Sequence, residues 1–358
     1  MTGDGYIAAP VGDGLLLARR LGERLYALNG SARFLWEQRA AGLADSELAP
    51  ALAEAYGIDP GRAEQDVRTT LRRWREDGLI GEPEATLCCG LAGTVVALRL
   101  GARDVEAVLR PLLAPLAPDG HQPRPAAALA VTREAGQLRV TIGEEPPQPA
   151  RSLDEAVATA LAGLARLAFD TADWQLALHG AAVAAPGGGC LVLPGLSGSG
   201  KTTLLTALLA RGFGHVADDL TLLDEDLVRP LPLPLVLKRG SWRLLGRLIP
   251  DLAEARVFRR AEQDVKYWLP PAERIARQPL PVRAILFPRF AGARGVAATR
   301  LEPFAALARI MESPARIGRP LGDEALGRLA RWLETCPAYE LAHDDAAAAA
   351  AWAATLAA

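Results

Sequence analysis

The chain has 358 residues, of which 50% are apolar, and its formal net charge at pH 7 is -2. This length suffices for two or three domains with hydrophobic cores, and the composition excludes a mainly disordered chain. The charge provides no overall attraction to nucleic acid or to an anionic membrane. No apolar run approaches the roughly 18 residues that cross a bilayer, and residues 1–11 lack a secretory signal, so we expect a cytoplasmic protein.

The four cysteines are Cys88, Cys89, Cys190 and Cys336, and none has the spacing of a zinc site. We therefore expect each thiol to be a small apolar group in a reducing compartment.

Residues 1–82 are predicted to form a small α+β domain of winged-helix type. Capping residues divide it, because Asn29 precedes the first helix, Gly57 ends the second and Asp59 precedes Pro60 at the start of the third. The predicted elements are a hairpin over 15–19 and 24–27 and helices over 31–41, 46–56 and 60–77.

A winged-helix fold often binds DNA, but the charge of residues 1–82 argues against this function. The segment carries ten arginines, no lysine and thirteen acidic residues. Phosphate contacts supply most non-specific affinity for nucleic acid, so we expect instead a peptide that adds a strand to the exposed hairpin edge. Packing against the rest of the chain is the alternative.

Residues 26–37 (YALNGSARFLWE), with the helices that end at 74–80, resemble the PqqD-like family. Members of this family are small winged-helix domains that bind leader segments of ribosomally made precursor peptides. The resemblance covers most of residues 10–82. It implies that a leader binds there, in a groove formed by residues 15–27 and the third helix.

Residues 83–165 are assigned to a linker and to a leading α/β layer of the domain formed by residues 166–358. We expect no catalytic or binding residues in this segment. Prolines between 111 and 125 predict a surface linker, and residues 127–132 and 137–142 predict a hairpin. Residues 152–155 (SLDE) form a predicted capping box, from which a helix extends to about residue 170.

Residues 166–358 are predicted to form an α/β core. Apolar runs at 176–185, 190–194, 215–224 and 282–288 predict buried strands, and helices are expected at 304–311, 323–334 and 344–356.

Within this core, residues 195–203 (GLSGSGKTT) match the phosphate-loop pattern G-x-x-x-x-G-K-[ST] between a predicted strand and a predicted helix. The glycines let backbone amides surround a phosphate, and the helix start adds a positive dipole end. The chain has only three lysines and 37 arginines, so a lysine at position 201 is unusual. This favours a specific role for Lys201 in binding the outer phosphates. The expected phosphate ligands are Gly195, Ser197, Gly198, Ser199, Gly200, Lys201, Thr202 and Thr203.

Asp218 and Asp219 end a predicted strand 17 residues after Lys201. A helix followed by glycines would return the chain beside the phosphate loop, so that both carboxylates reach the phosphates. One can then hold Mg²⁺ together with Thr202, and the other can orient an acceptor hydroxyl and take its proton. A solvated loop pair is the alternative.

Four segments together resemble, in order and spacing, the catalytic core of HPr serine kinases, which are related to phosphoenolpyruvate carboxykinases. The segments are His179-Gly180, residues 195–203, residues 211–213 and residues 216–219. The resemblance implies a kinase that transfers the γ-phosphate of ATP to a serine or threonine of a protein or peptide.

The same resemblance implies the roles of individual residues. Lys201 and the loop amides would hold phosphates, Thr202 and Asp219 would bind magnesium, Asp218 would be the base and His179 would line the site. Which of the two aspartates is the base stays open. From its pattern alone, a histidine in an apolar run such as His179 is more often a core residue.

Residues 235–242 depart from the pattern, because they lack the glycine-rich signature that accompanies phosphatase activity in bifunctional HPr kinases. Phosphate removal is therefore in doubt. Lys238 and Arg239 could instead hold a phosphate or the substrate peptide, and Lys266 is a weaker candidate. A solvated basic pair is the alternative.

The sequence thus predicts an ATP- and Mg²⁺-dependent kinase that phosphorylates a precursor peptide held through its leader. A regulatory HPr-type kinase acting on a folded protein and a nucleotide-gated peptide carrier without phosphotransfer are the alternatives, and charge disfavours a transcription factor. The peptide, its acceptor residue and the choice between ATP and GTP leave no mark in the sequence. Related kinases imply a homo-oligomer.

Overall fold

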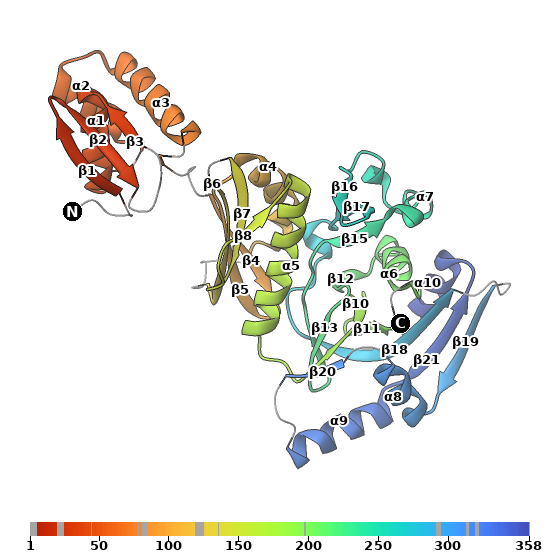
Figure 1. Cartoon of the computed structure of the whole chain (residues 1–358). Coiled ribbons are helices and arrows are strands. Elements are labelled where there is room, and N and C mark those ends of the chain that lie inside the picture. Colours follow the sequence, from red (N-terminus) through yellow and green to blue (C-terminus); the bar gives the residue numbers. More distant parts are fainter. Residues whose placement is uncertain are drawn as a thin grey trace. The chain divides into compact units, whose positions relative to one another are not determined.

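The computed structural model shows a mixed α/β fold with several sheets (Figure 1). The chain divides into two compact units, one made of residues 1–82 with 133–136 and the other of residues 83–132 with 137–358. The structure describes residues 6–19, 25–43, 45–77, 79–80, 85–118, 125–134, 136–196, 198–290, 295–312, 315–318 and 322–357.

The first unit contains a three-stranded antiparallel sheet, in the order β1-β2-β3, and three helices. The predicted hairpin is confirmed as β2 and β3, whereas the sequence did not predict β1. This edge strand is mostly exposed and contains Pro10, so it lacks the alternating apolar pattern of a core strand. The elements are β1 Tyr6–Val11, β2 Gly14–Arg19, β3 Leu25–Leu28, α1 Gly30–Ala40, α2 Leu48–Tyr56 and α3 Pro60–Glu76.

Capping residues set the helix boundaries of this unit as predicted. The Asn29 side chain accepts a hydrogen bond from the Ala32 amide at 3.0 Å, and Asp59 accepts one from the Arg62 amide at 3.1 Å. Gly57 ends α2 with a φ of +62°, a conformation that glycine adopts without strain.

Aromatic side chains connect the sheet of this unit to its helices. The Trp36 ring packs edge-on against Tyr6 at 5.6 Å and against Trp74 at 5.8 Å. The Tyr6 and Tyr26 hydroxyls donate hydrogen bonds to the backbone oxygens of Leu79 and Asp77, just beyond α3. Strands β1 and β3 are thereby joined to the C-terminal end of α3.

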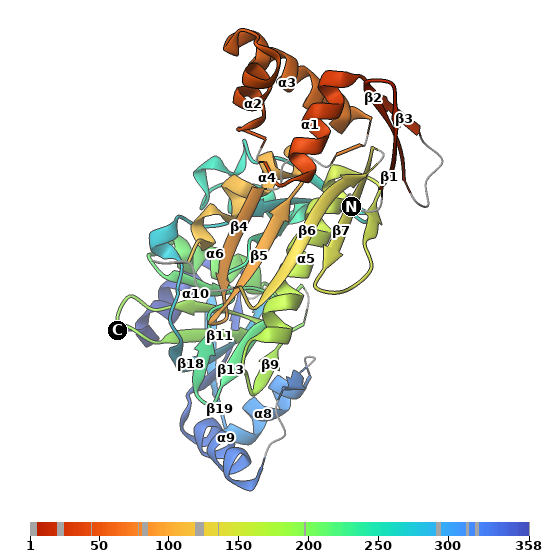
Figure 2. The same ribbon diagram turned by 90° about the vertical axis from the view of Figure 1, so that its left-hand side faces the viewer.

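The second unit begins with a five-stranded sheet in the order β4-β5-β6-β7-β8. Helix α5 packs against this sheet (Figures 1 and 2). The elements are β4 Ala85–Leu91, β5 Thr94–Leu100, α4 Arg103–Leu113, β6 Ala127–Glu134, β7 Gln137–Ile142, β8 Gln148–Ala150 and α5 Leu153–Thr171.

The predicted surface linker is wrong over its first part. Pro111 lies inside α4, which buries Val105, Leu109 and Leu113 along one face. Burial of this apolar stripe outweighs the cost of a proline near the end of the helix. Pro123 lies outside the described residues.

The predicted capping box at the start of α5 is confirmed. Ser152 Oγ accepts a hydrogen bond from the Glu155 amide at 3.1 Å, and Glu155 Oε2 accepts one from the Arg151 amide at 2.7 Å.

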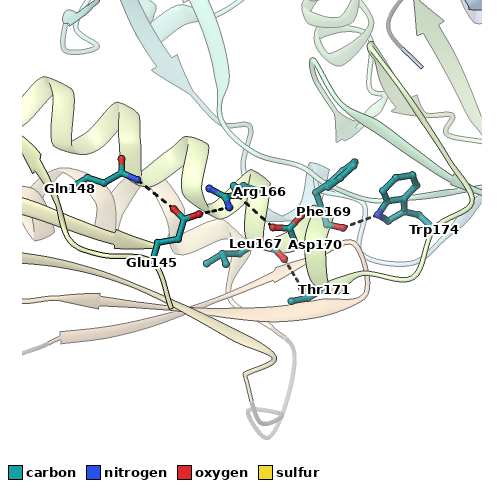
Figure 3. Close-up of polar contacts among 8 residues, drawn as sticks. All are labelled: Glu145, Gln148, Arg166, Leu167, Phe169, Asp170, Thr171 and Trp174. Atoms are coloured by element: carbon teal, nitrogen blue, oxygen red, sulfur yellow. Dashed lines mark hydrogen bonds and ion pairs between the residues drawn. The ribbon is translucent and has the colours of Figure 1, made fainter. Parts of the chain in front are cut away.

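The C-terminal end of α5 is held by local polar contacts (Figure 3). The Trp174 indole donates to the Phe169 carbonyl oxygen at 2.7 Å, and the rings of these two residues pack at a 41° tilt with their centroids 4.4 Å apart. Arg166 pairs with Glu145, which lies in the turn before β8, at 2.5 Å. These contacts fix the point at which the chain enters the large sheet.

The large sheet has ten strands, eight of them in the order β12-β10-β11-β18-β14-β13-β9-β20, while β21 pairs with β18 and β19. Helices α6 and α10 pack against each other in the apolar core beside it (Figure 1). The strands are β9 Leu176–Leu178, β10 Gly180–Ala184, β11 Cys190–Pro194, β12 Gly214–Ala217, β13 Thr221–Asp224, β14 Leu227–Arg229, β18 Leu280–Phe290, β19 Val296–Leu301, β20 Ala315–Ile317 and β21 Ala338–His343. The helices are α6 Lys201–Ala210, α8 Pro303–Met311, α9 Asp323–Thr335 and α10 Ala346–Ala354.

A third sheet of this unit has the order β15-β17-β16. Its elements are β15 Leu235–Lys238, α7 Trp242–Leu245, β16 Phe258–Arg260 and β17 Gln263–Trp268. Among the helices of the described residues, none combines the length and the apolar composition needed to cross a lipid bilayer.

Replacing Ser152 with Ala is expected to lower the free energy of unfolding by about 1 kcal/mol, because the Glu155 amide loses its acceptor. Urea denaturation of the whole chain, followed by tryptophan fluorescence, measures this change. Ser152→Thr, which keeps the hydroxyl, serves as the control. Equal stability of the alanine variant and the wild type would contradict the role of this cap.

Candidate functional site

The phosphate loop connects the buried strand β11 to helix α6. Gly195, Gly198 and Gly200 have φ angles of +148°, +88° and +98°. Side chains with a Cβ rarely adopt such angles, so the glycines of the motif are required by the shape of the loop. Ser197 lies outside the described residues.

The Lys201 ammonium group lies against its own loop. Nζ donates to the carbonyl oxygens of Gly195 at 2.6 Å and Leu196 at 2.9 Å, and the residue is 5% exposed. Burial lowers the pKa of Lys201, while the charges of Asp219 and Asp218 oppose that shift. The ammonium is therefore buried against the loop carbonyl oxygens, and the charges of both aspartates act on it.

The two aspartates follow directly after β12, and they differ in environment. The Thr202 hydroxyl donates to the half-buried Asp218 carboxylate, with oxygen distances of 3.3 and 3.4 Å. Burial raises the pKa of Asp218 to about 7, and the neighbouring charge of Asp219 adds to the shift. Asp219 is exposed and has a φ of +63°, which directs the chain away from the strand.

His179 joins the lysine to this aspartate segment. Its Nδ1 lies 2.9 Å from the Asp219 carbonyl oxygen, which can only accept, so Nδ1 carries the proton. In the neutral ring Nε2 is an acceptor, and it lies 3.5 Å from Lys201 Nζ, which can donate to it. The histidine is half-buried and faces the phosphate loop.

Strand order explains why these groups meet. Strand β10 pairs antiparallel with both β11 and β12, so these two strands run in the same direction. Their C-terminal ends therefore reach the same edge of the sheet, where β10 begins. The phosphate loop, the aspartates and His179 each occupy one of these three strand ends. The sequence predicted that the strand carrying the aspartates would lie beside the phosphate loop. In the structure this strand, β12, is separated from β11 by β10.

A cavity of about 910 Å³ opens over this edge. Its volume lies in the range of ligand pockets. The loop side is lined by His179, Gly198, Gly200, Lys201, Thr202, Thr203 and Asp219. The facing side comes from the sheet β15-β17-β16 and includes Lys238, Ser241, Arg260, Glu262 and Gln263.

Several candidates from the sequence lie outside this cavity lining. Gly195 and Ser199 line a second cavity of about 160 Å³ on the other side of the loop. Arg239 is not a lining residue, and it pairs with Asp264 at 3.0 Å. Lys266 is not a lining residue either, and its buried ammonium donates to the carbonyl oxygens of Leu252 and Ala253, near the Trp242 ring.

Arg260, Glu262 and Gln263 are cavity residues that the sequence did not single out. They belong to the hairpin between β16 and β17, whose tip contains Ala261 with a φ of +51°. No motif marks this hairpin, because three-dimensional folding rather than chain spacing brings it opposite the phosphate loop. The run of charged residues between two short strands was the only signal available.

The oxygen atoms at this edge suit magnesium. Mg²⁺ is usually held by one or two carboxylates or hydroxyls together with phosphates and water. Thr202, Asp218 and Asp219 provide such a set. Within the described part of the chain, no group of three or more His, Cys, Asp or Glu side chains gathers as a metal site would require.

The cysteine thiols lie apart from this chemistry. Burial raises the pKa of Cys89, Cys190 and Cys336 to about 12, which keeps these thiols protonated and unreactive.

Comparison with known proteins identifies one segment. Residues 16–80 match the family model described as Coenzyme PQQ synthesis protein D (PqqD). The matched segment contains β2, β3 and the three helices of the first unit. The predicted PqqD-like domain at the N-terminal end is thereby confirmed. No curated protein matches the chain.

Asp218→Asn is expected to change how stability depends on pH. Between about pH 4 and pH 7 the native carboxyl, with its pKa of about 7, keeps its proton while the unfolded chain releases it. Wild-type stability therefore falls as pH rises through this window, and the neutral amide avoids that loss.

Urea unfolding of both proteins at several pH values tests this expectation. The advantage of the variant should grow from pH 4 to pH 7 and stay constant above it. Parallel pH profiles of the two proteins would show that Asp218 titrates normally.

Proposed function

We propose that the chain is an ATP- and Mg²⁺-dependent kinase that phosphorylates a serine or threonine of a ribosomally made precursor peptide. The observation that carries the proposal is that Lys201 and Thr202 line one large cavity, and that the Thr202 hydroxyl donates a hydrogen bond to Asp218, which is not itself a lining residue. A phosphate loop alone indicates a nucleotide. A carboxyl group in contact with its threonine adds the chemistry of group transfer.

The loop supports binding of a triphosphate. Its glycines expose backbone amides, and Lys201 supplies a compact positive charge. Phosphate oxygens can replace the loop carbonyl oxygens as the hydrogen-bond acceptors of this ammonium group. Magnesium, when bound by Thr202 and an aspartate, would neutralise charge that develops on the phosphates. Lys238 and Arg260 lie across the cavity, where positive charge favours the same ligand.

The raised pKa of Asp218 supports a role as general base. A carboxyl group with a pKa of about 7 can take a proton near neutral pH and release it afterwards. In the proposed step the acceptor hydroxyl oxygen bonds to the γ-phosphorus, the bond from that phosphorus to the β-phosphate oxygen breaks, and Asp218 takes the hydroxyl proton. The products are ADP and a phosphopeptide.

The N-terminal domain supports a peptide as the substrate. PqqD-like domains bind leader segments, and residues 16–80 match that family. Strand β3 pairs with β2 along one side, and Leu25 on this strand is 69% exposed. Such an edge can accept an extended peptide as a further strand.

A leader held by one domain would raise the local concentration of the acceptor near the other. Tethered ligands commonly reach effective concentrations on the order of millimolar. The catalytic site then requires little affinity of its own for the acceptor segment. This explains why a peptide-binding domain and a phosphate loop occur in one chain.

Lys201→Ala is expected to lower kcat for peptide phosphorylation at least about a hundredfold, because the transferred phosphate loses its fixed positive charge. The measurement uses intact-peptide mass spectrometry after incubation with ATP, Mg²⁺ and the precursor peptide encoded beside the gene. Thr202→Ser keeps the hydroxyl and should keep most of the activity. Nucleotide binding by the wild type with no change in peptide mass would favour a carrier and contradict the kinase.

Leu25→Asp is expected to raise KM for the precursor peptide about tenfold or more while kcat changes little, because an acidic side chain disrupts the apolar edge that holds the leader. Ile7→Asp on the opposite edge strand is the matched control, since Ile7 is 56% exposed. Equal KM values for the two variants would contradict leader binding at β3.

A further inference from the structure

The segment from Lys238 to Lys266 is basic within an acidic chain. It carries eight basic and four acidic side chains, a net charge of +4, whereas the whole chain has a net charge of -2. This segment includes helix α7 and most of the sheet β15-β17-β16, and residues of that sheet make one wall of the large cavity. Positive charge is therefore concentrated on one side of the proposed reaction site.

Part of this charge is already compensated by neighbouring carboxylates. Arg239 and Arg259 share Asp264, at 3.0 and 3.1 Å, and Arg256 pairs with Asp154 at 3.0 Å. One aspartate between two arginines leaves a net positive charge at that position. Arg259 and Arg256 are thus held to the protein surface by their partners.

The remaining arginines face outward. Leu245 of α7 is buried, and the Trp242 ring lies over the Lys266 ammonium at 5.0 Å, so these two residues form the inner side of the helix. Arg243 in α7 and Arg247 in the turn that follows this helix are both exposed. Within the described residues, no carboxylate pairs with either of them or with Arg260.

Arg260 lines the cavity, and Arg243 lies close in the chain to another lining residue. Lys238, Ser241 and Arg260 line it directly, and Arg243 follows Ser241 by two residues, so their Cα atoms are at most about 7.6 Å apart. Figure 1 shows α7 beside β15 and β17. We call Lys238, Arg239, Arg243, Arg247 and Arg260 the basic face.

We propose that the basic face binds the acceptor segment of the peptide substrate and selects a serine or threonine flanked by aspartate or glutamate. The proposal rests on the proposed kinase function and specifies its substrate class. Charge complementarity is the argument, since exposed guanidinium groups attract carboxylates and fix their direction. Arg243 and Arg247 lie outside the cavity lining, beyond the groups that a nucleotide would contact.

A nucleic acid is the less favoured ligand. Nucleic-acid binding domains usually carry their positive charge over a broad surface, whereas the rest of this chain is acidic. The PqqD-like match points to a peptide as the partner of the same chain.

Fluorescence anisotropy on the whole chain tests the proposal without requiring catalysis. The probes are fluorescein-labelled Gly-Glu-Asp-Ser-Asp-Glu-Gly and its neutral counterpart Gly-Gln-Asn-Ser-Asn-Gln-Gly, at about 0.05 M and about 0.3 M salt. The acidic peptide should bind more tightly at low salt, and the difference should shrink at high salt. Arg243→Gln with Arg247→Gln should weaken binding of the acidic peptide about fivefold or more.

Matched variants control for folding and for general charge. Arg243→Lys with Arg247→Lys keeps the charge and should keep the preference for the acidic peptide. Arg300→Gln with Arg316→Gln removes two exposed arginines from β19 and β20 and should leave peptide binding unchanged.

Three results would overturn the proposal: equal binding of the two peptides, unchanged binding by the glutamine pair at 243 and 247, or tighter binding of a single-stranded oligothymidylate than of the acidic peptide. Binding of a fluorescent ATP analogue with Mg²⁺ is measured separately in the same variants. If the wild type does not bind the ATP analogue, the proposed kinase function is contradicted. If it binds the analogue normally but binds the acidic and neutral peptides equally, only the role of the basic face is contradicted.

Discussion

The contact between the Thr202 hydroxyl and the Asp218 carboxylate, at 3.3 Å, is the interaction on which the account of this protein depends. It exists because β10 lies between β11 and β12 and runs opposite to both, so that the phosphate loop and the aspartates reach the same edge of the sheet. Burial at that edge raises the pKa of Asp218 to about 7. Strand order thereby supplies both the position and the protonation chemistry of this carboxyl group.

Charge is arranged in layers around this contact. Lys201 is buried against loop carbonyls, the aspartates lie beside it, and the wall that faces them carries Lys238 and Arg260. An anionic ligand with a divalent cation would balance this set, because carboxylates attract the cation while the ammonium and guanidinium groups attract the anion. The same wall continues outward into exposed arginines. In the proposed function, the sheet β15-β17-β16 is the part that would select the substrate.

The sequence predicted the parts that local rules determine. The cap at Asn29, the capping box at Ser152 and the glycines of the phosphate loop follow from the backbone conformations that those residues favour, and the PqqD-like segment has a recognisable pattern. It did not predict β1, an exposed edge strand, or α4, whose Pro111 suggested a linker. Arg260 was missed because only the tertiary fold brings its hairpin opposite the loop.

The most direct test of the central claim is a crystal structure with Mn²⁺ and a non-hydrolysable ATP analogue, in which anomalous scattering locates the metal. We expect the metal within about 2.5 Å of Thr202 Oγ1 or a carboxylate oxygen of Asp218 or Asp219. We also expect that Lys201 Nζ leaves the carbonyl oxygens of Gly195 and Leu196 and contacts the outer phosphates. A nucleotide bound elsewhere, or a metal out of reach of both aspartates even through one water molecule, would contradict the account.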